Sequence, residues 1–271
     1  MGDDTSDIRQ FYDDSVEQED GRLDRHQLEC EMTWRYLDKY LPRFGKILEI
    51  GCAAGAYTVP LAKRGYNVTA VDFSPNLIKA CRQKARKEKL ESKIACVCAD
   101  ARELSAIADF DYDAALIMGP LYHLVLEDDR KTVIKQVSCH LKPGGVLIAI
   151  FISRYGIWND VLRDNPEHIG INGLAPDIVL KGYEEIPPEA RGKVFRGYFA
   201  APEEIRPLFE PEGFKTLALA GIESAGVRDM YYSPLKGKQR QLWLDLLFSI
   251  SAQPSIIGAA NHLLYVGEKE G

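Results

Sequence analysis

The sequence lacks the cysteine and histidine spacing typical of a tetrahedral zinc site. Its six cysteines stand at positions 30, 52, 81, 96, 98 and 139, with no Cys-x-x-Cys pair and no histidine arrangement for tetrahedral zinc. We therefore predict no metal site and mostly buried, reduced thiols, typical of a reducing compartment. Cys96 and Cys98 alternate along an expected strand, which allows a redox pair but favours two small buried side chains.

Positive charge is also scarce. The chain has 34 Lys and Arg against 40 Asp and Glu, a formal net charge of −6. This balance argues against the broad basic surface that salt-sensitive binding to a phosphate backbone requires. We therefore expect a small-molecule partner and no nucleic acid.

Long hydrophobic runs are missing as well. The most apolar segment, 144–152, is too short to span a bilayer. The amino terminus carries Asp3, Asp4 and Asp7 where a signal peptide would have basic residues. We predict a cytoplasmic protein without membrane insertion, while the oligomeric state stays open.

The chain does contain a regular alternation of short apolar runs and charged, helix-period stretches. This pattern is typical of repeated βαβ units in an α/β, doubly wound, mostly parallel sheet. With 271 residues, 46% of them hydrophobic, one large domain is the default. The expected strands are 46–51, 66–71, 93–98, 112–118 and 145–152, with further apolar runs at 214–222 and 262–267.

Turn and cap residues set several helix boundaries. Ser74 and Pro75 supply an N-cap hydroxyl and a proline at the first helical position. Gly65 is expected to close a helix that starts near Gly55, with Pro60 close to its first turn. Residues 142–145, Lys-Pro-Gly-Gly, predict a turn before the fifth strand. Helices are also expected at 128–140, 202–209 and 239–250.

We divide this domain into four segments. Residues 1–44 form an amino-terminal helical cap, and 45–152 form a cofactor-binding core. The irregular, Gly- and Pro-containing stretch 153–200 is an insertion and substrate lid, and 201–271 complete the sheet. Aromatic residues of the insertion either wall an acceptor pocket or form a small core of their own: Tyr155, Trp158, Tyr183, Phe195, Tyr198 and Phe199.

The turn after the first strand favours a positively charged cofactor. Such sheets bind ligands beyond the carboxyl ends of their strands, where the strand order reverses. Gly51-x-Ala53-x-Gly55 permits close backbone approach but lacks the Gly-x-Gly-x-x-Gly spacing of dinucleotide sites. Glu49 would repel a pyrophosphate. Asp72, at the end of the second strand, offers a carboxylate for both hydroxyls of a ribose.

Over residues 46–152 the sequence resembles the class I S-adenosylmethionine-dependent methyltransferases. Their motif, acidic-x-Gly-x-Gly-x-Gly, is matched by Glu49, Gly51 and Gly55, with Ala53 in place of the middle glycine. The resemblance implies a Rossmann-like seven-stranded sheet with an antiparallel seventh strand. It also implies S-adenosyl-L-methionine as the cofactor and S-adenosyl-L-homocysteine as the product.

The same likeness assigns further cofactor contacts. Asp72 would hold the ribose, and Asp100 would meet the adenine amino group. The resemblance also places Met118 and Gly119, from the loop 117–124, along the methionine part. The remaining implied contacts are Phe73 beside the adenine, Ala101 next to Asp100, and Tyr12, which either touches the carboxylate or sulfonium end or only anchors its helix.

Methyl transfer from a sulfonium needs little beyond positioning, because the donor is already activated. Holding two reactants in line can supply about 7–11 kcal/mol of the barrier. If the acceptor must lose a proton, His123 and Tyr122 are the candidates for this step, although either side chain can instead serve packing. Gly119-Pro-Leu-Tyr122 also lacks the Asn/Asp-Pro-Pro-aromatic signature of some methyltransferases that act on nucleic-acid bases.

These observations predict a methyltransferase acting on a small, partly apolar metabolite by in-line displacement. Two alternatives stay open. One is a nicotinamide-dependent oxidoreductase on a similar sheet, and the other is a protein that binds S-adenosylmethionine without turnover.

Overall fold

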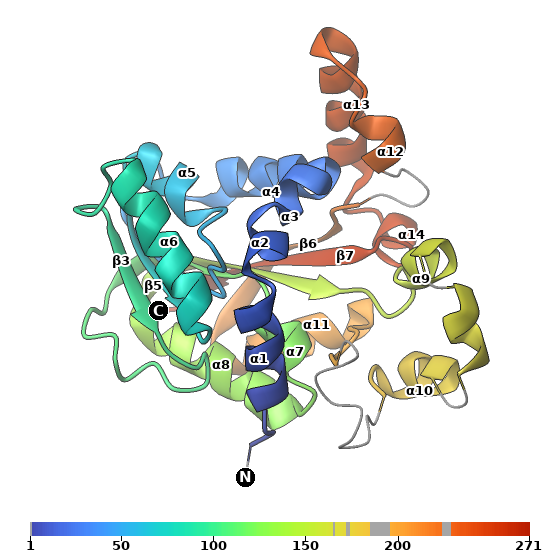
Figure 1. The fold of residues 1–271 in the computed structure, drawn as a ribbon, viewed down its shortest axis with the longest axis horizontal. Helices are drawn as coiled ribbons and strands as arrows, with labels where there is room; N and C mark the ends of the chain where they lie inside the picture. Colours follow the sequence, from blue (N-terminus) through green and yellow to red (C-terminus); the bar gives the residue numbers. More distant parts are fainter. Residues whose placement is uncertain (1, 165, 172–173, 185–195, 224–228) are drawn as a thin grey trace.

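The computed structural model describes residues 2–164, 166–171, 174–184, 196–223 and 229–271 and contains a seven-stranded sheet (Figure 1). The strand order is β3-β2-β1-β4-β5-β7-β6. The strands are β1 (Lys46–Ile50), β2 (Asn67–Asp72), β3 (Ile94–Cys98), β4 (Tyr112–Ile117), β5 (Leu141–Ile152), β6 (Phe214–Gly221) and β7 (His262–Lys269). β1 to β5 pair in parallel, and β7 is antiparallel to β5 and β6. The predicted fold, including the antiparallel seventh strand, is confirmed.

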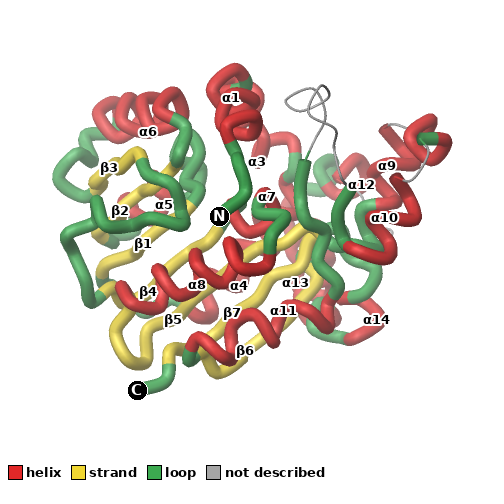
Figure 2. The backbone as a smooth tube through the Cα atoms, turned by 90° about the horizontal axis from the view of Figure 1, so that it is seen from below, coloured by secondary structure: helices red, strands yellow, loops and turns green. Residues whose placement is uncertain are grey.

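Helices cover both faces of the sheet (Figure 2). One face packs against α4 (Gln27–Tyr40), α5 (Thr58–Lys63) and α6 (Pro75–Lys87), and α13 (Gly237–Ile250) packs against α4 on the same side. The other packs against α8 (Glu127–His140), α11 (Pro202–Phe209) and α14 (Pro254–Ile257). In β1, Ile47 belongs to the first core and Leu48 to the second, and both are fully buried. Burial on both faces explains why Ile47, Leu48 and Ile50 are apolar without a strict polar alternation.

The remaining elements flank this sandwich. The amino-terminal helices are α1 (Ser6–Asp14), α2 (Val16–Asp20) and α3 (Arg22–Arg25), and α7 (Pro120–His123) follows β4. The predicted insertion holds α9 (Trp158–Asp164), the 3-10 helix η1 (Pro166–Gly170) and α10 (Leu174–Lys181), while η3 (Glu210–Glu212) and α12 (Asp229–Tyr232) lie near β6. Across the described ranges, no helix has the length and apolar character needed to cross a membrane.

The predicted helix starts are confirmed where the cap chemistry is strong. The Ser74 hydroxyl accepts the Leu77 amide hydrogen at 3.1 Å, with Pro75 at the first helical position of α6. α5 begins at Thr58, so Pro60 lies within its first turn, where a missing donor costs little.

Two expectations were wrong. Residues 142–145 do not form a turn before β5 but belong to that strand. They produce a shift in its pairing with β4: Tyr112 pairs with Leu141, whereas Ala114 pairs with Val146. Most thiols are not buried: Cys52 and Cys81 are, but Cys30 and Cys96 are partly exposed and Cys98 and Cys139 are exposed. Cys98 lies on β3, an edge strand of the sheet, which explains its exposure. All six are free thiols.

Candidate functional site

A cavity lies at the carboxyl ends of β1, β2 and β4, where the strand order reverses between β1 and β4. It holds about 990 Å³ of empty space, including its open mouth. Residues of α1, the α2–α3 region, the β1 turn and α7 surround it. Its lining includes all but one of the cofactor and catalytic residues predicted from the sequence: Tyr12, Glu49, Gly51, Ala53, Asp72, Phe73, Asp100, Ala101, Met118, Gly119, Tyr122 and His123.

The exception is Gly55, which lies behind the cavity wall. Its φ is +86°, and an added Cβ would meet Cys81 Sγ at 2.9 Å. Gly51 lines the cavity with φ +76°, and a Cβ there would meet Pro120 Cδ at 2.5 Å. The turn therefore needs glycine at both positions, for backbone conformation and for close packing. Ala53 takes the middle glycine's place in the same left-handed region, with φ +46°.

Glu49 brings a buried carboxylate to the cavity floor. Its Oε2 accepts the Thr58 hydroxyl hydrogen at 2.6 Å, whereas Oε1 has no hydrogen-bond partner among the described residues. Burial raises the pKa of Glu49 to about 8, although the Thr58 hydrogen bond works in the opposite direction. A buried acceptor without a donor is costly, so this oxygen suits a ligand that brings a donor.

Asp72 forms the side of the cavity next to the glycine turn. Its Oδ2 accepts the Ala53 amide hydrogen at 2.9 Å and its Oδ1 the Ser74 amide hydrogen at 3.0 Å. Burial raises the pKa of Asp72 to about 6, although the two hydrogen bonds act to lower it. Each carboxylate oxygen can accept a second hydrogen bond, so the fixed carboxylate can still bind two ligand hydroxyls.

Asp100 lines the cavity, but both of its oxygens are already bound by Arg102, at 3.0 Å from Nε and 2.7 Å from a terminal nitrogen. Although burial opposes it, this pairing lowers the pKa of Asp100. Asp100 therefore presents an ionised carboxylate in a fixed orientation. If Asp100 bound an adenine amino group, its carboxylate would accept hydrogen bonds from that group and from the Arg102 guanidinium together.

Tyr12 and His123 meet over the cavity. The Tyr12 hydroxyl lies 2.6 Å from His123 Nε2, and His123 Nδ1 faces the carbonyl oxygen of Arg196 at 3.4 Å. A carbonyl accepts only, so Nδ1 carries the hydrogen and Nε2 accepts from Tyr12. Burial lowers the pKa of His123 to about 4, so the ordinary histidine pKa assumed from the sequence does not apply. Burial also raises the pKa of Tyr122, beside it, to about 12.

Acidic residues near the amino terminus help to hold residues 3–7, which we call the roof of the cavity because Thr5 lines it. The sequence alone assigned these residues no role beyond their negative charge. Arg196 binds Asp3 and Asp7, with its Nε 3.0 Å from an Asp7 oxygen. Arg102 reaches the Asp3 carbonyl at 2.7 Å and the Thr5 hydroxyl at 3.2 Å. Thr5 itself lines the cavity. Two arginines from distant parts of the chain thus fix the segment that leads into α1.

None of the insertion aromatics that the structure describes lines this cavity. Trp158 and Phe199 pack with Ile152 and Ile178 in a separate small core, and Tyr198 belongs to the main core. Tyr155 is exposed, Tyr183 is partly buried, and Phe195 lies outside the described residues. Where the structure describes them, these residues favour the small-core alternative over an acceptor pocket.

Residues 47–145 match the family profile described as a methyltransferase domain. The chain is 30% identical over 118 residues to the carboxy-S-adenosyl-L-methionine synthase of Shewanella loihica, covering 42% of the chain and 46% of that protein. It is 35% identical over 126 residues to the ubiquinone biosynthesis O-methyltransferase of Xylella fastidiosa, covering 44% and 47%. With the tRNA 5-carboxymethoxyuridine methyltransferase of Escherichia coli K12, identity is 26% over 137 residues, covering 48% and 51%. The chain spans about half the length of these relatives.

The whole fold also has a solved counterpart. The magnesium protoporphyrin IX methyltransferase of Synechocystis PCC 6803, crystallised with S-adenosylhomocysteine, superposes with a TM-score of 0.60 over 99% of this chain and 100% of that one, at 14% identity. Residues 47–145 thus match a methyltransferase domain, and the fold of the described chain is that of this solved methyltransferase. Neither the profile nor this solved structure supports the alternative of a nicotinamide-dependent oxidoreductase.

Proposed function

We propose that this chain, built on a class I methyltransferase domain, transfers the methyl group of S-adenosyl-L-methionine to a small-molecule acceptor. The observation that carries the proposal is the pairing of two buried carboxylates, Glu49 and Asp72, on either side of a glycine turn in one cavity. Oε1 of Glu49 meets no donor from the part of the chain that the structure describes, and the ammonium group of a methionine moiety would supply one. Asp72 supplies the acceptors that a ribose needs.

The other lining residues fit the rest of this cofactor. Phe73 and Ala101 border the place for an adenine ring next to Asp72, and Asp100 lies beside them. Met118 and Gly119, between the glycine turn and α7, border the place for the methionine part. When bound, the cofactor supplies an activated methyl group, so no further electrophile is required of the protein.

The contribution of the protein is mainly to hold the acceptor in line and to exclude water. Positioning of this kind can lower a barrier by about 7–11 kcal/mol. Thr5, Ile8 and Tyr12, from α1 and the segment before it, line the cavity together with Tyr122 and His123 of α7. We place the acceptor among these residues.

Tyr12, Tyr122 and His123 act in this proposal by orienting the acceptor. With a pKa near 4, His123 is a weak base at neutral pH and instead fixes the Tyr12 hydroxyl through Nε2. The Tyr12 oxygen keeps its lone pairs for an acceptor hydroxyl or amine. Burial raises the pKa of both tyrosines, so they act as neutral hydrogen-bonding groups.

A small acceptor fits this cavity better than a tRNA. Arg196 and Arg102 hold the roof segment in place. Three acidic residues, Asp3, Asp4 and Asp7, precede Ile8, and Asp129 lies against Arg102, where a polynucleotide would need positive charge. The relatives include a tRNA enzyme, so the test compares both classes.

Calorimetric titration with S-adenosylhomocysteine tests the cofactor. We expect Asp72→Asn to weaken binding at least tenfold, an effect of about 1.4 kcal/mol that matches lost hydrogen bonds. Asp38→Asn, an exposed carboxylate paired with Arg64, is the matched control. Equal affinity in wild type and Asp72→Asn would reject the site.

Turnover is tested separately, by release of S-adenosylhomocysteine from protein incubated with S-adenosylmethionine and a panel of aromatic, amine and carboxylate metabolites, with bulk tRNA as a second arm. Release that depends on a small acceptor supports the proposal. Release only with tRNA overturns the acceptor class, and binding without any transfer favours a cofactor-binding protein without turnover.

A further inference from the structure

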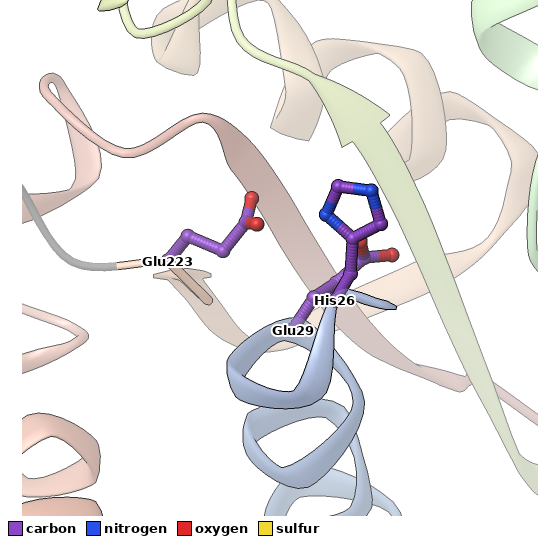
Figure 3. A group of neighbouring side chains, drawn as sticks. All are labelled: His26, Glu29 and Glu223. Carbon is purple, nitrogen blue, oxygen red and sulfur yellow. The ribbon is translucent and has the colours of Figure 1, made fainter. Parts of the chain in front are cut away.

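A cluster of metal-ligating side chains lies outside the machinery assigned above. His26, Glu29 and Glu223 each offer one ligand atom, and these atoms all lie within 4.8 Å of one another. Figure 3 shows His26 and Glu29 at the start of α4 and Glu223 reaching toward them from the segment that follows β6. Residues separated by nearly two hundred positions thus converge on one point.

We propose that His26, Glu29 and Glu223 bind a divalent first-row cation of the Zn²⁺ class. One imidazole nitrogen with two carboxylate oxygens is a donor set that Zn²⁺ uses, and Mg²⁺ and Ca²⁺ prefer all-oxygen sites. Three protein ligands leave a fourth position for water or another oxygen. The inference goes beyond methyl transfer and does not depend on it.

Charge around the cluster favours a cation. Among the described residues, three carboxylates gather here, from Glu29, Glu223 and Asp229, the last with an oxygen 3.8 Å from His26 Nδ1. They face one guanidinium, that of Arg22, which binds both oxygens of Glu29. Although burial opposes it, the charge of Glu223 raises the pKa of His262 to about 9. With that imidazole protonated and His26 neutral, one net negative charge remains in this partly buried place, which a bound cation would offset.

The existing hydrogen bonds leave room for an ion. A carboxylate has about four lone-pair sites, so Glu29 can bind Arg22 and a metal together. His262, the first residue of β7, binds Glu223 through Nδ1 and thereby fixes that carboxylate. Hydrogen-bond partners of this kind orient metal ligands and sustain affinity. Asp229 accepts the Leu28 amide hydrogen at 2.8 Å and holds the start of α4 in place.

The position of the cluster gives the ion a structural consequence. It would join the start of α4 to the chain after β6, at the same edge of the sheet as the cavity. Arg22 lines the cavity and contacts Glu29, so one side chain separates the ion from the cofactor wall. The pattern His26-x-x-Glu29 is visible in the sequence, but its third ligand lies too far along the chain to be found there.

Metal binding to the purified full-length chain, stripped with a chelator and dialysed, tests the site without reference to catalysis. The probes are Zn²⁺, titrated calorimetrically, and Co²⁺, followed by its visible absorption. We expect one ion per chain, bound roughly tenfold to a hundredfold more weakly in Glu223→Gln and in His26→Gln. Asp245→Asn, an exposed carboxylate paired with Arg35, is the control and should bind as wild type does.

Two results would overturn the proposal. Failure of wild type to bind either ion shows that the cluster is an ion-pair network. Equal binding by wild type and both variants places the ion elsewhere on the surface. His26 is partly exposed, so His26→Gln carries the test if Glu223→Gln fails to fold, as judged by circular dichroism in chelator. If the protein binds the metal but transfers no methyl group, the proposed function is contradicted and the metal site is not.

Discussion

The hydroxyl of Tyr12 lies 2.6 Å from Nε2 of His123, although 111 positions separate the two residues in the sequence. Their rings also pack edge to face, with centroids 5.2 Å apart. The contact joins α1 to the end of α7, and both residues line the cavity. The amino-terminal helix is thus part of the site and not merely a cover over it.

Tyr12→Phe removes only the hydroxyl and should lower kcat/KM for the acceptor by about tenfold. The lost hydrogen bond is worth roughly 0.5–1.5 kcal/mol. In combination with His123→Ala the second substitution should add little, because the two groups act as one pair. Tyr155→Phe, at an exposed tyrosine outside the cavity, is the control. Fully additive effects of the two substitutions in steady-state kinetics would mean that the pair does not act as a unit.

Binding of the cofactor should release a proton from Glu49. Burial raises the pKa of this carboxyl from 4.5 to about 8, so it is protonated at pH 7 in the free protein. An ammonium group against Oε1 favours the ionised form. Calorimetric titration with S-adenosylhomocysteine in phosphate and in Tris should therefore give different enthalpies for wild type. Glu49→Gln should show a smaller buffer dependence, and an unchanged one would remove Glu49 from the ligand contacts.

The same pKa shift predicts how stability changes with pH in the free protein. A carboxyl whose folded pKa lies above its unfolded value stabilises the folded state fully below pH 4.5, and this contribution is lost as pH rises through 8. Urea unfolding of wild type should therefore show a fall in stability over this range that Glu49→Gln lacks. A difference between the two proteins that does not vary with pH would contradict this assignment.

Arg196→Gln should loosen the roof of the cavity. Arg196 is buried and binds Asp3 and Asp7, and hydrogen bonds between charged groups contribute about 1.5–3 kcal/mol. We expect a loss of this size in urea unfolding, together with faster proteolysis of the amino terminus. Arg64→Gln, which breaks an exposed pair with Asp38, should change stability by less than about 1 kcal/mol. Protection of the amino terminus in Arg196→Gln would show that other contacts hold the roof.

Local signals in the sequence predicted the part of the site built from contiguous residues. Gly51 follows β1 and Asp72 is the last residue of β2, so their place at one sheet edge follows from βα alternation alone. The contact of Arg196 with Asp3 and that of Tyr12 with His123 depend on how the ends of the chain fold back, which no local pattern encodes. Exposure of Cys98 likewise depends on β3 being an edge strand. The strand order thus determines the exposure of Cys98, which the residue pattern alone does not predict.

Gly51→Ala should impair both folding and cofactor binding, and the chain offers a control that separates two causes. Gly51 has φ +76°, and its added Cβ would lie 2.5 Å from Pro120 Cδ. Gly213 has a similar φ of +82°, but no atom of the described residues lies within 4 Å of an added Cβ. Both alanines carry the backbone cost of about 1–3 kcal/mol.

Only Gly51→Ala adds the clash, worth roughly another 1–3 kcal/mol. Urea unfolding should therefore rank Gly51→Ala below Gly213→Ala, and only the former should weaken binding of S-adenosylhomocysteine. Equal stabilities would mean that Pro120 moves aside and that glycine is required at this turn for its backbone conformation alone.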